Sequence, residues 1–200
     1  PLRRLGDADY EMIFLFPYSH AGYYPGAKMI GWKVLFRKSD GRLLGAQAVG
    51  LDGPAVDKRI SALAVAIQMG ATVYDLEEAE LCYAPQFGSA KDAVNFAGMV
   101  AADVLHGDMP LAHWSDADGA FLLDVRQPVE LVVESVAGAV NIPLPQLRKR
   151  LGELPRDREI LVICRSAQRA YYATRILLQN GFKVRNLSGG MLVRAMVAGD

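Results

Sequence analysis

The sequence predicts two domains of different fold class: an α+β domain built on an antiparallel sheet, then an α/β domain built on a parallel sheet. The first prediction rests on Asp40-Gly41, which lies between the apolar runs 30–36 and 43–50. An Asp-Gly pair in this position is a strong signal for a hairpin. The second rests on strand-like runs that alternate with helical stretches after residue 120, the pattern of a parallel sheet.

Two helices are expected to complete the first domain. One runs from about Pro54 to Met69 with apolar residues at helical spacing, and the other runs from about residue 91 to 105. Gly107 and Pro110 then interrupt the pattern, so we place the domains at residues 1–108 and 109–200. Each half is long enough to bury a core of its own.

The second domain is expected to contain strands at 121–125, 159–163 and 184–187, with a helix over 166–180. Gly181 is placed to end that helix. Parallel sheets bind ligands beyond the carboxyl ends of their strands. Cys164 directly follows the strand at 159–163, so it is predicted to stand at such an end.

Cys164 opens a short polar loop that leads into the helix. A helix start offers unpaired backbone N–H groups, and Arg165 and Arg169 add positive charge, so these surroundings favour a thiolate and an anion bound to it. The loop residues Arg165, Ser166, Ala167 and Gln168 are therefore candidates for substrate binding. Phosphatases that use cysteine have arginine at the sixth position after it, where this chain has Ala170, so that interpretation is disfavoured. A buried, inert thiol is the alternative, and it is our expectation for Cys82.

The C-terminal half resembles a rhodanese domain over roughly residues 110 to 200. The motifs that carry the resemblance are Leu122–Arg126 with Pro128 and Glu130, Ala137–Pro143, Cys164–Arg169 and Asn186–Gly190. The resemblance implies that Cys164 carries a sulfane sulfur as a persulfide, with the loop amides and Arg169 stabilising the anion. It also suggests supporting roles for Asp124 and for Glu130, which would pair with a loop arginine.

Two residues depart from the rhodanese pattern. Ala167 stands where the family often has glycine, so a positive φ there would strain the loop. The histidine often found before the Gly-Ala-x-Asn-Ile-Pro signature is absent, and the sequence reads Glu134-Ser135-Val136. Neither departure removes the nucleophile.

The first half resembles the C-terminal dimerisation domain of flavin-dependent pyridine nucleotide-disulfide oxidoreductases, in the branch of coenzyme A-disulfide reductase and NADH oxidase. The segments that carry it are 20–26, 45–50, 57–60 and 83–92. The resemblance implies that Tyr83 and either Tyr23 or Tyr24 serve the partner subunit's disulfide site, although they could simply pack at an interface.

Basic residues of the first half give a further candidate site. Lys58, Arg59 and Lys91 could bind the phosphates of coenzyme A or could be solvated surface, which we favour. His20 is expected to be a structural hydrogen-bonding residue rather than a catalyst.

Composition narrows the classes of function. The formal net charge is +0, so no basic surface is offered to nucleic acid. Two cysteines and the lack of a long apolar run or signal peptide indicate a reducing compartment, and we expect the cytoplasm and no membrane partner. The chain starts at Pro1, so we expect a fragment of a longer protein.

No Gly-x-Gly-x-x-Gly motif follows a strand, and no metal site is predicted. No cofactor is therefore expected within the chain, whereas FAD, NAD(P)H and coenzyme A are expected for the full-length protein. The leading hypothesis is the C-terminal part of a coenzyme A-disulfide, persulfide or polysulfide reductase with a fused rhodanese, acting as a homodimer. The alternative is a non-catalytic dimerisation and binding fragment with an inert cysteine. The sequence leaves open the natural sulfur donor and the thiol acceptor.

Overall fold

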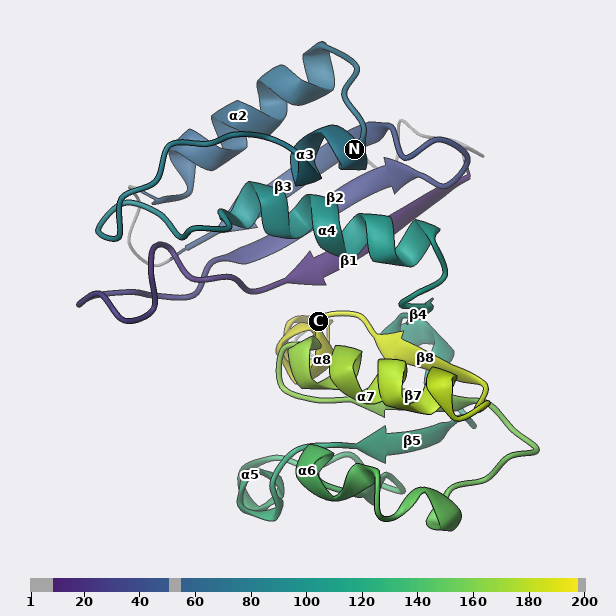
Figure 1. Cartoon of the computed structure of the whole chain (residues 1–200). Helices are drawn as coiled ribbons and strands as arrows, with labels where there is room; N and C mark the ends of the chain where they lie inside the picture. Colours follow the sequence, from purple (N-terminus) through teal and green to yellow (C-terminus); the bar gives the residue numbers. More distant parts are fainter. Residues whose placement is uncertain (1–8, 51–54, 198–200) are drawn as a thin grey trace. The chain divides into compact units, whose positions relative to one another are not determined.

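The computed structural model describes residues 9–50 and 55–197. The chain divides into two compact units between His106 and Gly107, two residues before the predicted end of the first domain (Figure 1). The first unit is built on a three-stranded sheet and the second on a five-stranded sheet. The predicted fold classes, antiparallel first and parallel second, are confirmed.

The antiparallel sheet of the first unit has the order β1-β2-β3. Its strands are β1 (Tyr10–Leu15), β2 (Gly31–Arg37) and β3 (Leu43–Val49). The β2–β3 hairpin is the predicted one, and Gly41 has a φ of 71° in its turn, where glycine is favoured. Strand β1 was not predicted, because its apolar run lacks a turn signal and its place is fixed by pairing with β2.

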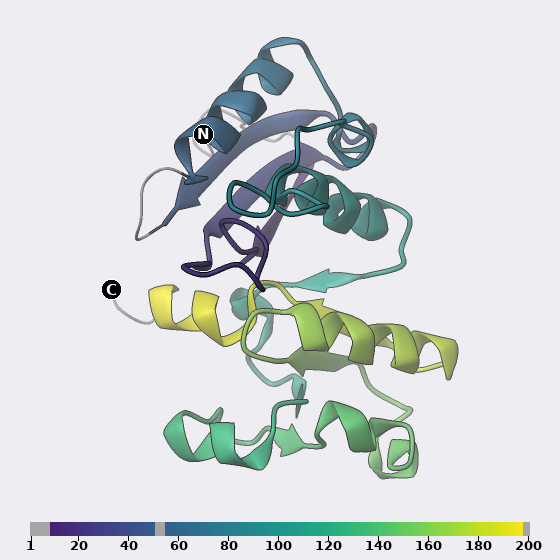
Figure 2. The same ribbon diagram turned by 60° about the vertical axis from the view of Figure 1, so that its left-hand side comes forward.

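Three helices accompany this sheet: α2 (Asp57–Gln68), α3 (Val73–Glu77) and α4 (Ala93–Leu105), which can be followed in Figure 2. Helix α2 contacts β3, α4 contacts β1, and the two helices contact each other, so they cover one face of the sheet. Helix α4 begins later than predicted because Asp92 caps it and accepts from the backbone N–H of Val94. Pro54, the predicted start of α2, lies outside the described residues.

The parallel sheet of the second unit has the order β4-β8-β7-β5-β6. Its strands are β4 (Leu111–Ala112), β5 (Phe121–Asp124), β6 (Val140–Asn141), β7 (Ile160–Ile163) and β8 (Val184–Leu187). Strands β5, β7 and β8 were predicted. The two-residue strands β4 and β6 are too short to leave a periodic pattern and exist through pairing with their neighbours.

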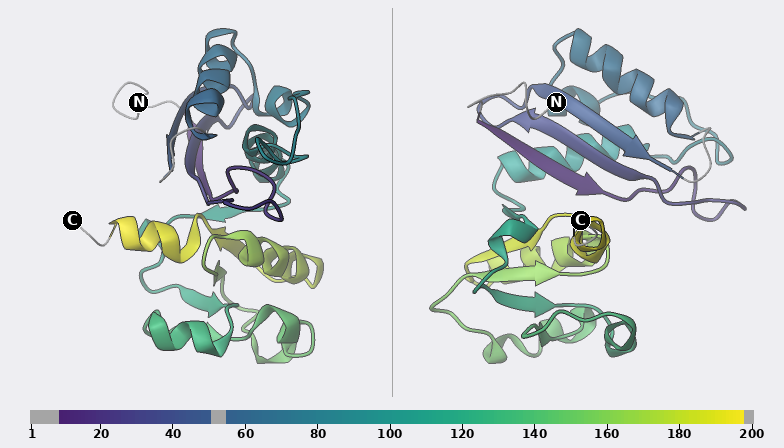
Figure 3. Two further views of the ribbon diagram at one scale, coloured as in Figure 1. Left: turned by 90° about the vertical axis from the view of Figure 1, so that its left-hand side faces the viewer. Right: turned by 180° about the vertical axis from the view of Figure 1, so that it is seen from behind.

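Helices cover both faces of this sheet. They are α5 (Pro128–Val133), α6 (Leu144–Leu147), α7 (Gln168–Gln179) and α8 (Gly190–Val197), with short 3₁₀ turns at Trp114–Asp116 and Leu151–Glu153. One core cluster joins Leu123 and Val162 to α7, and the other joins Leu161 to Met191 of α8. Figure 3 shows α7 and α8 on opposite sides of the strands. Across the described ranges, no helix is long and apolar enough to cross a membrane.

Candidate active site

Cys164 lies at the carboxyl end of β7, between the neighbouring strands β5 and β8. Its side chain is buried at 1% exposure and belongs to the core cluster beneath α7. The chain then makes a loop of three residues, and α7 begins at Gln168. In the loop Arg165 is exposed and Ser166 is half-buried, while Gln168 at the helix start is exposed. The strand-loop-helix arrangement around the cysteine is therefore the predicted one.

Ala167 has a left-handed backbone conformation, with φ 70° and ψ −11°. It is the one non-glycine residue with a positive φ in the described ranges. Its carbonyl accepts hydrogen bonds from the backbone N–H of Tyr171 at 2.9 Å and from Nδ2 of Asn186 at 3.3 Å. The strain expected at this non-glycine position is thus present, and these two bonds hold the residue in place.

Backbone N–H groups gather at this loop without partners. Within the described part of the chain, the N–H groups of Arg165, Ser166 and Ala167 donate no hydrogen bond. The first-turn N–H groups of α7 have no acceptor inside the helix. Such a group of N–H donors is suited to an anion.

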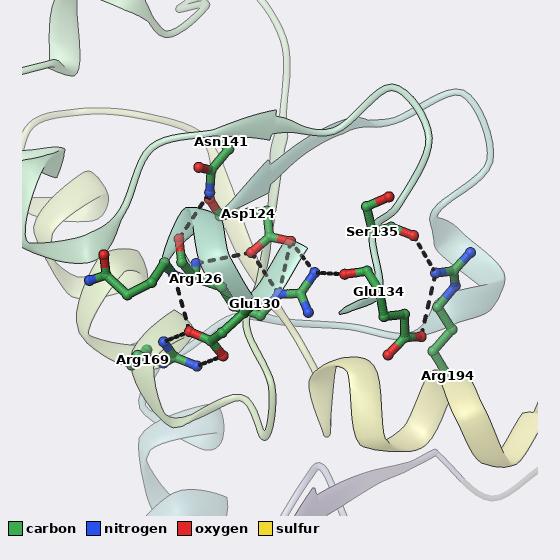
Figure 4. Close-up of polar contacts among 9 residues, drawn as sticks. Asp124, Arg126, Glu130, Glu134, Ser135, Asn141, Arg169 and Arg194 are labelled. Carbon is green, nitrogen blue, oxygen red and sulfur yellow. Dashed lines mark hydrogen bonds and ion pairs between the residues drawn. The ribbon is translucent and has the colours of Figure 1, made fainter. Parts of the chain in front are cut away.

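Arg169 and Glu130 form a two-pronged ion pair beside the loop, drawn in Figure 4. The two guanidinium nitrogens donate to the two carboxylate oxygens at 2.6 and 2.7 Å. The hydrogen bonds from Arg169 lower the pKa of Glu130 from 4.5 to about 2, helped by the backbone N–H of Gln127. The pKa of Arg169 is raised, first by Glu130 and more weakly by the charge of Cys164. The predicted pairing of Glu130 with a loop arginine is therefore present.

Asp124 and Arg126 form a second pair, which is deeply buried. The guanidinium of Arg126 donates to Oδ2 of Asp124 at 2.7 Å and to Oδ1 at 3.0 Å, and this bonding raises the pKa of Arg126. Asn141 donates to the carbonyl oxygens of both residues, at 2.8 and 3.0 Å. Arg126 also donates to the carbonyl of Glu134 at the end of α5, so the pair ties β5 to α5, and Asn141 ties it to β6. Sequence reasoning missed Arg126 as its partner, although the two stand two positions apart.

In the first unit the hydroxyl groups of Tyr23 and Tyr83 lie 2.7 Å apart and form a hydrogen bond. This bond raises the pKa of Tyr83. Tyr24 instead meets the ring of His20 edge-on, with ring centroids 5.9 Å apart. The structure therefore brings together Tyr23 and Tyr83, the choice that the sequence left open. The ring nitrogens of His20 form hydrogen bonds with the hydroxyl of Ser19 and the carbonyl of Pro25, as expected for a structural role.

The predicted basic cluster separates in the structure. Lys58 and Lys91 are exposed, and Lys58 donates to the carbonyl of Phe87. Arg59 is 2% exposed, and its guanidinium binds Asp92 at 2.7 Å and the carbonyl of Ala55 at 2.7 Å. The expectation that Arg59 is solvated surface is wrong, because the side chain is buried. Each of its three guanidinium nitrogens already donates to Asp92 or Ala55, which disfavours it as a phosphate ligand.

A signal for the burial of Arg59 was available in the sequence. Arg59 precedes Leu63 by four positions, which places it on the apolar face of α2. The expectation that Cys82 is buried is also wrong, because its side chain is exposed.

Comparison with known proteins assigns both units. The family model of the rhodanese-like domain matches residues 110–193, and that of the pyridine nucleotide-disulphide oxidoreductase dimerisation domain matches residues 4–94. A curated sulfurtransferase of Allochromatium vinosum is 34% identical over 82 residues, which cover 40% of this chain and 77% of that protein. The chain belongs to the rhodanese-like family. Its rhodanese-like domain follows a dimerisation domain of the oxidoreductase family.

The pairing of a dimerisation domain with a rhodanese-like domain recurs in solved structures. The crystal structure of reduced Bacillus anthracis CoADR-RHD is 41% identical in sequence, with a TM-score of 0.92; the match covers 98% of this chain and 36% of that chain. The structure of the NAD-dependent persulfide reductase from A. fulgidus is 37% identical, with a TM-score of 0.82; the match covers 92% of this chain and 34% of that chain.

The coenzyme A disulfide reductase of Staphylococcus epidermidis is 42% identical over 97 residues, which are 48% of this chain and 22% of that protein. The chain therefore spans about a third or less of these reductases.

Proposed function

We propose that the rhodanese-like domain is a sulfurtransferase in which Cys164 carries the transferred sulfur. The observation that carries the proposal is the position of Cys164 at the end of β7, under a loop whose backbone N–H groups are unpaired and beside the cationic Arg169. Burial of the thiol alone is equally typical of an inert cysteine, so the proposal rests on the loop. The similarity to a protein named as a sulfurtransferase supports it.

The proposed transfer has two displacement steps. The Cys164 thiolate attacks the sulfane sulfur of a donor, a new S–S bond forms, and the donor's S–S bond breaks as the leaving group takes the electron pair. With thiosulfate the leaving group is sulfite. An acceptor thiolate then attacks the outer sulfur, leaves as a persulfide, and returns Cys164 to the thiolate. The two steps together require no outside oxidant or reductant.

Arg169 and the loop amides are proposed to stabilise the anionic outer sulfur of the Cys164 persulfide. Arg169 is held by two bonds to Glu130, so its guanidinium is fixed before the donor arrives. Glu130 is thus a positioning residue that acts through Arg169. Asp124 has a more distant role: it pairs with Arg126, which donates to the carbonyl of Glu134 at the end of α5, the helix that bears Glu130.

In the full-length protein we propose that this chain is the C-terminal part of a reductase for coenzyme A-disulfide, persulfide or polysulfide. Support comes from the similarity to proteins with those printed names. FAD and NAD(P)H would be held by regions outside this chain, and the dimerisation domain would form a homodimer. The hydrogen-bonded Tyr23 and Tyr83 would donate a proton to a thiolate leaving the partner's disulfide site. The exposed Lys58 and Lys91 remain candidates for the coenzyme A phosphates.

Single-turnover sulfur transfer tests the proposal. The chain is loaded with thiosulfate or a persulfide donor, and transfer to cyanide and to coenzyme A is measured. Transfer should vanish in Cys164→Ser and persist in Cys82→Ser, which removes the other, exposed thiol. Transfer that persists in Cys164→Ser would refute Cys164 as the sulfur carrier, and the absence of transfer by the unmodified chain would favour the non-catalytic dimerisation and binding fragment.

A further inference from the structure

The first turn of α8 is bonded to the backbone of the Cys164 loop. The N–H of Met191 donates to the carbonyl of Cys164 at 3.0 Å, and the N–H of Leu192 donates to the carbonyl of Arg165 at 3.0 Å. These carbonyls belong to two consecutive peptide groups of the loop. Helix α8 thus fixes the orientation of both peptide planes.

This orientation decides where the loop's N–H groups point. In a trans peptide the C=O and the following N–H point in opposite directions, and the described chain contains no cis peptide. Because the carbonyls of Cys164 and Arg165 face α8, the N–H groups of Arg165 and Ser166 face away from it. These are the N–H groups that donate no bond within the described ranges.

Gly190 allows α8 to approach the loop this closely. Its φ is 56°, and a Cβ built on it would lie 2.2 Å from the carbonyl oxygen of Cys164 and 3.0 Å from the carbonyl carbon of Arg165. Both neighbours are backbone atoms, which cannot swing aside as a flexible side chain could. Any larger residue at this position must therefore push the loop peptides away from α8.

Helix α8 is itself anchored from two sides. The indole N–H of Trp114 donates to the carbonyl of Gly190 at 2.9 Å. Arg194 lies over the ring of Trp114, with its guanidinium carbon 5.5 Å from the ring centroid, and donates to the carbonyl of Ser135 at 3.1 Å. Figure 4 shows Arg194 reaching Ser135 and Glu134, whose carbonyl accepts from Arg126 at 3.0 Å. The loop's support is therefore connected to the buried pair below β5.

We propose that Gly190 is a positioning residue for sulfur transfer, because it lets the first turn of α8 orient the N–H groups of Arg165 and Ser166 toward an anionic donor. This inference rests on the proposed function and goes beyond it by assigning the orientation of the anion cradle to an element outside the loop.

Two readouts on the 200-residue chain test the inference. The first is the binding of thiosulfate to Cys164→Ser, which is monitored by NMR through the backbone amide resonances of Arg165 and Ser166. The second is the sulfur-transfer rate in the chain with Cys164 intact. Gly190→Ala is compared in each background with Gly181→Ala, whose φ is 76° and whose Cβ would meet nothing within 4 Å. The control thus carries a similar backbone strain without the contact.

We expect thiosulfate to shift both amide resonances in Cys164→Ser and in its Gly181→Ala derivative, and not in its Gly190→Ala derivative. Gly190→Ala should lower kcat/KM for sulfur transfer by about 100-fold or more, the usual effect of losing an oxyanion donor, with KM raised because thiosulfate binding is lost. If Gly190→Ala does not fold, Trp114→Phe decides, since it removes one bond to α8 and should slow transfer by about fivefold.

The failures can be told apart. Equal anion binding and equal transfer in Gly190→Ala and Gly181→Ala would overturn the inference and leave the sulfurtransferase proposal standing. Absence of transfer together with Gly190-dependent binding would overturn the sulfurtransferase proposal and leave only the role of Gly190 in anion binding standing. Amide resonances that do not respond to thiosulfate in Cys164→Ser would overturn anion binding by the loop amides, and unchanged transfer in Trp114→Phe would overturn the role of α8 in orienting them.

Discussion

Replacing Glu130 with glutamine removes the charge that holds Arg169 and keeps the size of the side chain. Arg169 lowers the pKa of Glu130 from 4.5 to about 2. Each pKa unit is worth about 1.4 kcal/mol, so the lowered pKa means that the folded protein favours the charged form of Glu130 over the neutral form by about 3 kcal/mol more than the unfolded chain does. The two side chains are 29% and 33% exposed, and solvent screening reduces the contribution to about 1–2 kcal/mol.

The pH dependence has a definite direction. A carboxylate whose folded pKa is lowered stabilises the folded state above its ordinary pKa, and that contribution disappears as the pH falls through the folded value. At neutral pH the free energy of unfolding of the unchanged chain should therefore be about 1–2 kcal/mol higher than that of the Glu130→Gln variant. The difference should shrink as the pH falls from 4.5 to about 2.

Urea unfolding of the chain and of Glu130→Gln, from about pH 7 down to about pH 2.5, measures this difference. Glu153→Gln serves as a control because Glu153 pairs with Arg150 on the exposed surface. Its effect should stay within experimental error. A difference for Glu130→Gln that is absent at neutral pH, or that persists unchanged below pH 3, would refute the reasoning. The same variant should slow sulfur transfer about tenfold, because a loosened Arg169 stabilises the anion less well.

Three further predictions concern backbone strain, the tyrosine pair and the buried ion pair of the first unit. Ala167→Gly should raise the free energy of unfolding by about 0.5–1 kcal/mol in urea, because glycine adopts the left-handed conformation without strain. Tyr23→Phe should lower the pKa of Tyr83 toward its ordinary value in an ultraviolet phenolate titration, because the hydrogen bond that raises it is lost. Asp92→Asn should cost about 3–5 kcal/mol, because Arg59 keeps a buried and uncompensated charge.

The tyrosine and ion-pair predictions each have a matched comparison. Tyr24→Phe should leave the titration of Tyr83 unchanged, since Tyr24 contacts His20 instead. Asp40→Asn breaks the exposed pair with Arg37 and should cost under about 1 kcal/mol. Equal losses in the two aspartate variants, or an unfolding free energy that does not rise in Ala167→Gly, would contradict these assignments.

Local patterns in the sequence were sufficient for most of the fold. The hairpin at Asp40-Gly41, strands β5, β7 and β8, and helices α2, α4 and α7 were predicted because turn chemistry and apolar periodicity are properties of short segments. Helices α3, α5, α6 and α8 and strands β1, β4 and β6 were missed. They are short or lack a turn signal, and each strand owes its place to the strand it pairs with.

By itself the sequence determined that Cys164 follows a buried strand and precedes a helix with Arg169, and a pattern of this kind needs only neighbours along the chain. Tertiary structure decided which partners these groups have. Glu130 meets Arg169 across 39 positions, Arg59 meets Asp92 across 33, and Trp114 meets Gly190 across 76. Contacts over such separations depend on which faces of distant segments pack together, and packing is a property of the folded chain that no local pattern records.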